Sequence, residues 1–207
     1  MSARVDTAMT TSQEDIARAN LYALLARLLY AGPDAKLLQA IAAADEMPAT
    51  ETSALSAAWH ALQAASAVME AEAAALEYEQ VFIGLGQGEV MPYLSWHLTG
   101  FLMEEPLAKL REDLAALGLA RVTGVGEPED HMSALCEVMC LLVAGDSQTA
   151  PAPLQRQRAF FERHLRPWYA KFAAQLEAAP SANYYRPVAR LLRAFLDVEA
   201  QAFDMGS

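Results

Sequence analysis

The sequence predicts an all-α fold, and its composition gives the first reason. It contains 43 Ala and 28 Leu but only 10 Val and 3 Ile. Ala and Leu favour helices, whereas strands draw on β-branched residues. With 207 residues, 54% of them hydrophobic, the chain can bury a core without a metal or disulfide. We expect a flexible tail over residues 1–10 and, over 11–207, a single compact helical domain of about six to eight helices.

Capping and turn residues predict the elements of the N-terminal half. Thr11 and Glu14 have the spacing of a capping box, which starts the first helix. Gly32-Pro33 ends that helix. The next elements are a short Ala-rich helix, a loop and a long helix, expected over 33–44, 45–52 and 53–82. A break of the long helix near Glu70 is left open.

Two irregular segments divide the C-terminal half. Closely spaced glycines followed by Pro92 predict a loop over 84–92. A helix then runs over 95–117, where we expect Pro106 to kink or divide it. A second Gly- and Pro-containing segment covers 124–131. The last three helices are expected over 132–144, 154–178 and 182–202, with a linker over 145–153.

The charge and the cysteines limit the class of protein. A net charge of −11 argues against coating DNA or RNA and against binding anionic membranes, but it allows a positively charged partner. The N-terminal residues lack the apolar core of a secretory signal, and no membrane-spanning run is expected. Cys136 and Cys140 offer no disulfide framework, which favours the reducing cytoplasm.

Standard catalytic and metal motifs have little support in the sequence. The glycines of residues 84–88 lack the Lys-Ser or Lys-Thr of a phosphate loop. His131, Cys136 and Cys140 could be metal ligands, but their spacing is not that of structural zinc, so core packing is favoured. No nucleophile elbow is present, and no catalytic residue is predicted.

An acidic corner precedes one of the helices. Glu127, Glu129 and Asp130 lie directly before His131. Acidic residues at a helix N-terminus are stabilised by the positive end of the helix dipole, and Asp is a common N-cap, a role that Asp130 could fill here. The same cluster could hold a guanidinium group. The residues alone leave both interpretations open.

The loop before residue 97 is unusually rich in large side chains. Phe82, Met91, Tyr93, Trp96 and His97 lie within sixteen positions. They could cap the core, with their polar atoms turned to water. They could also form an apolar platform that, beside the acidic corner, suits a peptide with an apolar run and basic residues.

Three segments in order carry a resemblance to a known family. They are residues 77–84 (EYEQVFIG), 91–96 (MPYLSW) and 127–132 (EPEDHM). Together they resemble the TorD/DmsD/NarJ family, cytoplasmic chaperones dedicated to molybdoenzymes. Residues 19–30 also resemble the first helix of that family, and the likeness extends over about residues 14–200.

The resemblance implies a non-enzymatic, all-helical chaperone. Such proteins bind the N-terminal twin-arginine signal of a molybdoenzyme precursor and delay export until the molybdenum cofactor is inserted. The implied partner is the precursor of a molybdoenzyme catalytic subunit, whose identity stays open, and the implied state is a monomer or a domain-swapped dimer. No resident cofactor, nucleic acid or membrane insertion is expected; weak binding of molybdenum cofactor or GTP is left open. The alternative is a helical protein that binds a small ligand, nucleotide or metal in the same pocket.

The resemblance also implies a set of signal-binding residues. Carried over by position, they are Tyr78, Phe82, Pro92, Tyr93, Ser95, Trp96, Asp130 and His131. The neighbouring side chains that suit the same role are His97, Glu127 and Glu129. We expect the aromatic residues to meet the apolar stretch of the signal and the acidic residues to meet its arginines.

Overall fold

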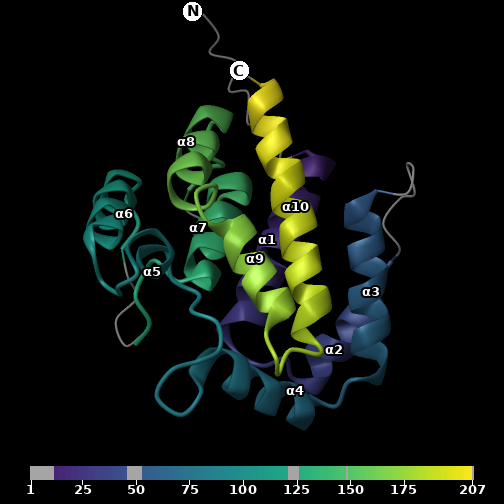
Figure 1. Cartoon of the computed structure of the whole chain (residues 1–207). Coiled ribbons are helices and arrows are strands. Elements are labelled where there is room, and N and C mark those ends of the chain that lie inside the picture. The colour runs from purple at the N-terminus through teal and green to yellow at the C-terminus, as the bar shows by residue number, and fades with distance from the viewer. Residues whose placement is uncertain (1–11, 46–52, 121–125, 148, 207) are drawn as a thin grey trace, which may run out of the picture.

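The computed structural model describes residues 12–45, 53–120, 126–147 and 149–206, and these residues confirm the all-α prediction (Figure 1). The predicted tail over 1–10 lies outside them. The described residues form ten α-helices and one π-helix and contain no strand. In chain order they are α1 (Gln13–Tyr30), α2 (Ala35–Ala42), α3 (Ala54–Val68), α4 (Ala71–Tyr78), the π-helix (Glu79–Ile83), α5 (Leu94–Thr99), α6 (Glu105–Ala116), α7 (Met132–Ala144), α8 (Leu154–His164), α9 (Tyr169–Ala178) and α10 (Tyr185–Met205).

The helices outnumber the expected six to eight because three of the predicted long helices are divided. Glu70 has an extended backbone and separates α3 from α4, which confirms the break near this residue. Gly100, in the left-handed conformation at φ 83°, ends α5 early. Pro106 then lies in the first turn of α6, where its missing N–H costs no helical hydrogen bond. Pro167, which the sequence reading overlooked, lies between α8 and α9.

The first helix begins one residue later than the capping box predicted. Its N-cap is Ser12, whose Oγ accepts a hydrogen bond from the Asp15 backbone N–H at 3.0 Å. The same hydroxyl donates to the Asp15 carboxylate at 2.8 Å, so the two side chains satisfy each other. Thr11 lies outside the described residues. The residues that cap the helix are therefore Ser12 and Asp15, each one position after the predicted pair of Thr11 and Glu14.

Two groups of packed helices form the body of the molecule (Figure 1). Helix α1 packs along α7, and α10 packs against α9 and α3, with α2 covering α3. Helices α5 and α6 lie to one side of this body. The long helix α10 supplies the largest apolar face to the core, including Val188, Leu191, Leu192, Phe195, Leu196 and Phe203. Over the described ranges, no helix has both the length and the apolar character that crossing a bilayer requires.

A carboxylate on α4 fixes the start of α10. Glu77 is buried and accepts backbone N–H groups from Asn183, Tyr184 and Tyr185 at 2.7, 3.0 and 2.8 Å. These N–H groups have no partner within their own helix, and a negative charge there is stabilised by the helix dipole. Glu77, which lies on α4, therefore acts as the N-cap of α10.

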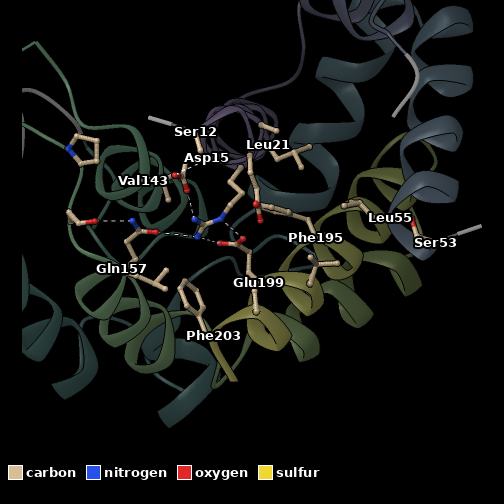
Figure 2. Close-up of a pocket in the computed structure, with 18 of the residues that line it drawn as sticks. Ser12, Asp15, Leu21, Ser53, Leu55, Val143, Gln157, Phe195, Glu199 and Phe203 are labelled. Carbon is tan, nitrogen blue, oxygen red and sulfur yellow. Dashed lines mark hydrogen bonds and ion pairs between the residues drawn. The ribbon is translucent and has the colours of Figure 1, made fainter. Parts of the chain in front are cut away.

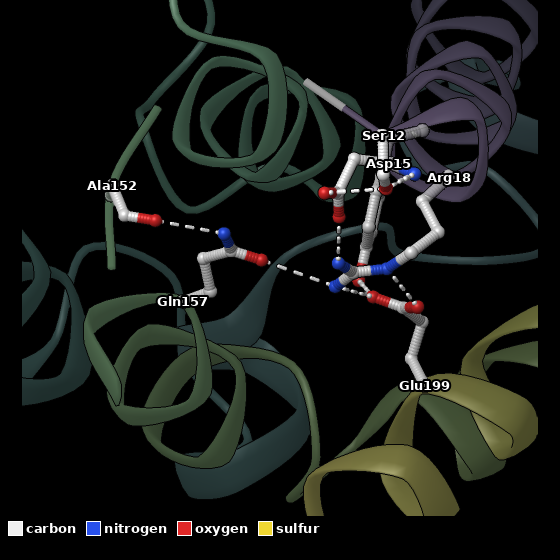
Figure 3. A network of polar contacts seen from close by, with 7 residues as sticks. Ser12, Asp15, Arg18, Ala152, Gln157 and Glu199 are labelled. Carbon is white, nitrogen blue, oxygen red and sulfur yellow. Dashed lines mark hydrogen bonds and ion pairs between the residues drawn. The ribbon is translucent and has the colours of Figure 1, made fainter. Parts of the chain in front are cut away.

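A buried ionic network ties α1 to α8 and α10 (Figure 3). Arg18 donates from Nε and Nη2 to the two oxygens of Glu199, at 2.7 and 2.8 Å. It also donates to Asp15 at 2.8 Å and to Gln157 at 3.1 Å. Tyr22 completes the network with a hydrogen bond to Glu199 at 3.0 Å. Glu199 is only 2% exposed, so its charge depends on these partners.

Replacing Glu199 with Gln should therefore destabilise the fold strongly. The substitution removes the buried Glu199 carboxylate and leaves the largely buried Arg18 only the more exposed Asp15 as an anionic partner. Such a loss costs about 3 kcal/mol of unfolding free energy. Urea denaturation followed by circular dichroism measures this cost. The matched control is Glu177→Gln, which breaks the exposed pair with Arg190 and should cost less than about 1 kcal/mol. Equal effects of the two substitutions would contradict a stabilising role for the network.

Candidate peptide-binding site

The structure brings the aromatic loop and the acidic corner together. Tyr93 and His131 form an isolated antiparallel bridge. On either side of it, Leu94 N–H donates to Asp130 O at 2.9 Å and Met132 N–H donates to Pro92 O at 2.8 Å. The residues before α5 and the residues before α7 therefore lie side by side. The sequence predicted that both belong to one site, but not that their backbones are paired.

Asp130 serves as the cap of α5. This six-residue helix has no side-chain cap of its own, and the Asp130 carboxylate accepts hydrogen bonds from both the N–H and the hydroxyl of Ser95. Asp130 is 1% exposed and Ser95 is fully buried. The second carboxylate oxygen of Asp130 is also buried, and it has no hydrogen-bond partner among the described residues. The carboxylate faces the interior, so its observed contacts hold two segments together.

His131 caps the next helix. Its Nδ1 accepts the Ser133 N–H at 3.1 Å, which leaves the ring proton on Nε2. The ring also packs edge-on against Tyr93, with centroids 5.1 Å apart. The residue is 5% exposed, and burial lowers the pKa of His131 to about 4. The imidazole is therefore neutral at pH 7.

The tyrosines of the predicted site are only partly buried. Tyr93 donates to Glu127 at 2.5 Å, and burial together with this hydrogen bond raises the pKa of Tyr93. Tyr78 donates to the Tyr30 carbonyl at 2.6 Å, at the end of α1. Burial, followed by the charge of Glu127, raises the pKa of Tyr78 to about 12. Tyr78 also packs on the buried Phe82, with ring centroids 5.0 Å apart.

The remaining aromatic residues divide between core and surface. His97 hydrogen-bonds through Nε2 to the Met91 carbonyl at 2.8 Å, and burial lowers the pKa of His97. Its ring lies 4.8 Å from that of Trp168, which is fully buried. Trp96, by contrast, is half-buried. Of the predicted site residues, those that are buried are Phe82, Pro92, Ser95, Asp130 and His131.

A pocket of about 360 Å³ lies against the acidic corner. Its walls come from the end of α1, the end of α6 and one face of α7, and its apolar members include Leu114, Leu119, Val138 and Leu141. Three acidic side chains also line it, namely Glu127, Glu129 and Glu137. Among the described residues that line this acidic pocket there is no Lys or Arg.

Sequence reasoning missed several lining residues. Glu137 and Leu141 lie on the same face of α7 as Ala134, as their helical spacing requires. The sequence shows this spacing, but it shows equally the apolar stripe on the opposite, buried face of α7 and does not say which face lines a pocket. Burial raises the pKa of Glu137. Tyr30, from the far end of the first helix, could not be placed here without the packing of α1 on α7.

A larger cavity lies elsewhere in the molecule (Figure 2). It has a volume of about 700 Å³ and lies between the start of α1, α8 and α10. Its buried charged groups are those of the Arg18–Glu199 network, which are already paired with one another. None of the eleven predicted site residues lines it. Three of them, Glu127, Glu129 and His131, line the acidic pocket, and the other eight do not. The smaller, acidic pocket is therefore the better candidate.

The glycine loop and the cysteines have structural explanations. A side chain at Gly84, where φ is 60°, would meet the Gln87 carbonyl, and one at Gly88 would meet the Phe82 backbone. Cys136 is buried, and burial raises the pKa of its thiol. Within the described ranges, no three His, Cys, Asp or Glu side chains are grouped so that they could hold a metal ion.

The neutral state of His131 should make the fold sensitive to acid. The folded pKa of about 4 lies below the ordinary value of 6.5, so at pH 5 the unfolded chain binds a proton that the folded protein excludes. Unfolding free energy is therefore lost as the pH falls from about 6.5 toward 4. Between pH 7 and 5 the contribution of His131 is about 2 kcal/mol.

The variant His131→Asn tests this, because Asn retains a cap oxygen but does not titrate. Urea denaturation at pH 7, 6 and 5 should show a shallower loss of stability in the variant than in the wild type. The absolute stability will also change, since the contact with Tyr93 is lost, so the slope is the quantity to compare. Parallel slopes would contradict the buried, neutral state of this imidazole.

Comparison with known proteins agrees with this architecture. The family model described as nitrate reductase delta subunit matches residues 49–174. Proteins named chaperone protein TorD are similar to the chain. The one from Actinobacillus succinogenes is 28% identical over 59% of this chain and 61% of its own length. The one from a Psychrobacter species is 28% identical over 74% of this chain and 72% of its own length.

A solved structure shares the fold. It is described as a redox enzyme maturation protein from Archaeoglobus fulgidus, with a TM-score of 0.59 and 21% identity over 94% of this chain and 99% of that chain. At this identity the likeness concerns the fold alone. The family model, in contrast, matches more than half of the sequence. The chain therefore belongs to the nitrate reductase delta subunit family, the TorD/NarJ family that its three sequence motifs indicated.

Proposed function

We propose that this protein is a non-enzymatic chaperone that binds the N-terminal twin-arginine signal of a molybdoenzyme precursor in the acidic pocket. Its family and the names of its relatives support a role as a chaperone. In this role it holds the precursor in the cytoplasm until the molybdenum cofactor has been inserted and export can follow. The client is the catalytic subunit of a molybdenum oxidoreductase.

The observation that carries this proposal is the composition of the pocket. Apolar side chains from α6 and α7 form walls that suit the hydrophobic stretch of a signal peptide. Glu127, Glu129 and Glu137 line the same cavity and suit arginine side chains, which form charge-assisted hydrogen bonds with carboxylates. The three acidic groups oppose binding of nucleotide phosphates there, which disfavours a nucleotide carrier using this pocket.

The size of the pocket allows a moderate affinity. Removing a few hundred Å² of apolar surface from water contributes several kcal/mol, at about 25 cal/mol per Å². Ordering of the peptide offsets part of this gain. A micromolar dissociation constant, equivalent to about −8 kcal/mol, is therefore expected.

The predicted site residues divide into two roles in this proposal. Tyr78 and Tyr93, which keep part of their surface accessible and hydrogen-bond to the lining residues Tyr30 and Glu127, extend the apolar platform beyond the pocket. We assign the half-buried Trp96 to the same platform. The buried Asp130 acts by positioning α5 and does not contact the peptide, whereas His131 both caps α7 and lines the pocket. Loss of Asp130 would then weaken binding only through loss of structure.

Calorimetric titration tests the proposal. Synthetic twin-arginine signal peptides of the molybdoenzymes encoded in the source genome are titrated one by one, beginning with the one nearest this gene. One of them should bind with a micromolar dissociation constant. Glu127→Gln and Glu137→Gln should each weaken that binding about fivefold, because each removes one charge-assisted contact. Trp96→Ala should weaken it to a similar degree through lost apolar contact.

The matched control is Glu112→Gln, which removes an equal charge from an exposed position on α6 that does not line the pocket. It should leave binding unchanged. The same peptide with both arginines replaced by glutamine should bind much more weakly. Failure of every signal peptide to bind the folded protein would overturn the proposal, as would equal weakening by the control.

A further inference from the structure

A guanidinium group from the chain itself already holds one of the pocket carboxylates. Arg111 on α6 donates from Nε and Nη2 to the same oxygen of Glu129, at 3.1 and 2.8 Å. The Glu129 side chain is 15% exposed, whereas that of Arg111 is 53% exposed. The arginine thus approaches from the solvent side, and Glu129 lines the pocket.

Glu129 and Glu127 differ in the charge of the group that each one binds. Glu127 accepts a hydrogen bond from the neutral hydroxyl of Tyr93. Glu129 is held by a cation with the same chemistry as the arginines that the pocket is proposed to bind. A ligand arginine that bonds to the same Glu129 oxygen would have to take the place of Arg111, since both would use the same lone pairs.

We propose that Arg111 is an internal competitor for the peptide. In the free protein it bonds to one oxygen of Glu129, and it is displaced when an arginine of the bound peptide takes that oxygen. The inference rests on the proposed function, because it assigns a regulatory contact to the same site. Its consequence is that Arg111 limits the affinity for the signal, which favours release.

The geometry makes this exchange feasible. Arg111 is half-exposed on the outer face of α6, so its long side chain can move into water without unfolding the helix. An ion pair with an exposed partner is worth little, so displacement weakens binding by only a small factor, about threefold. The effect is within the range that calorimetry resolves for a micromolar ligand.

Arg111→Gln tests the inference directly. Titration with the signal peptide that binds the wild type should give a dissociation constant about threefold lower in this variant. Removing any cation near an acidic pocket also strengthens the general attraction for a basic peptide. The matched control is therefore Lys109→Gln, which removes the same charge from the same helix but breaks a pair with Glu105 instead. It should lower the dissociation constant by this general effect alone, and therefore by much less than Arg111→Gln does.

A second arm uses the Glu129→Gln background. There the competitor has no carboxylate to occupy, so adding Arg111→Gln should produce no tightening beyond the general effect. Thermal unfolding of all variants checks that the fold is intact. If the wild type binds peptide and Arg111→Gln binds equally or more weakly, the inference is overturned while the proposed function stands. Equal tightening by Lys109→Gln, or tightening that persists in full without Glu129, overturns it as well. If the wild type binds no signal peptide, the proposed function fails and the inference fails with it.

Discussion

The pairing of the residues before α5 with those before α7 is the constraint on which the candidate site depends. Two main-chain hydrogen bonds flank the Tyr93–His131 bridge, and the buried Asp130 carboxylate adds a third attachment at Ser95. A six-residue helix is too short to be stable alone, so α5 needs this external cap. The same junction fixes the direction in which α7 begins, and one face of α7 then forms a wall of the pocket.

The acidic residues of this chain do two different kinds of work, and burial separates them. Glu77 and Asp130 are buried, and each bonds to the start of a helix in another part of the chain: Glu77 accepts three backbone N–H groups, and Asp130 accepts the N–H and hydroxyl of Ser95. Glu127, Glu129 and Glu137 lie along the pocket, where their charge is available to a ligand or to a neighbouring side chain. The sequence left two roles open for the acidic residues 127–130, helix capping and binding of a guanidinium group. In the structure Asp130 acts as a cap, and Glu129 holds the guanidinium of Arg111.

Local patterns in the sequence were sufficient for the fold class but not for the site. The Ala and Leu content, the break near Glu70 and the end of the first helix just before Gly32-Pro33 are local properties, and the sequence alone predicts them. Pro167 was equally readable and was overlooked. The Arg111–Glu129 pair and the approach of Tyr30 to α7 depend on how distant helices pack, so no spacing along the chain could reveal them. For the same reason, the prediction that Asp130 caps the helix after it was wrong: His131 caps that helix, and Asp130 caps a helix 35 residues earlier.

The electrostatics of the pocket follow from the burial of His131. A protonated imidazole beside Glu127 would offset part of the negative charge that a basic peptide needs. The attraction of Glu127 favours that protonated form, but burial outweighs it and lowers the pKa of His131 to about 4. The histidine can therefore cap α7 through its neutral Nδ1 without reducing the charge of the pocket. Because the imidazole stays neutral, it does not compete with a ligand for these carboxylates, whereas the Arg111 guanidinium is bonded to Glu129 and is exposed enough to be exchanged for that of a ligand.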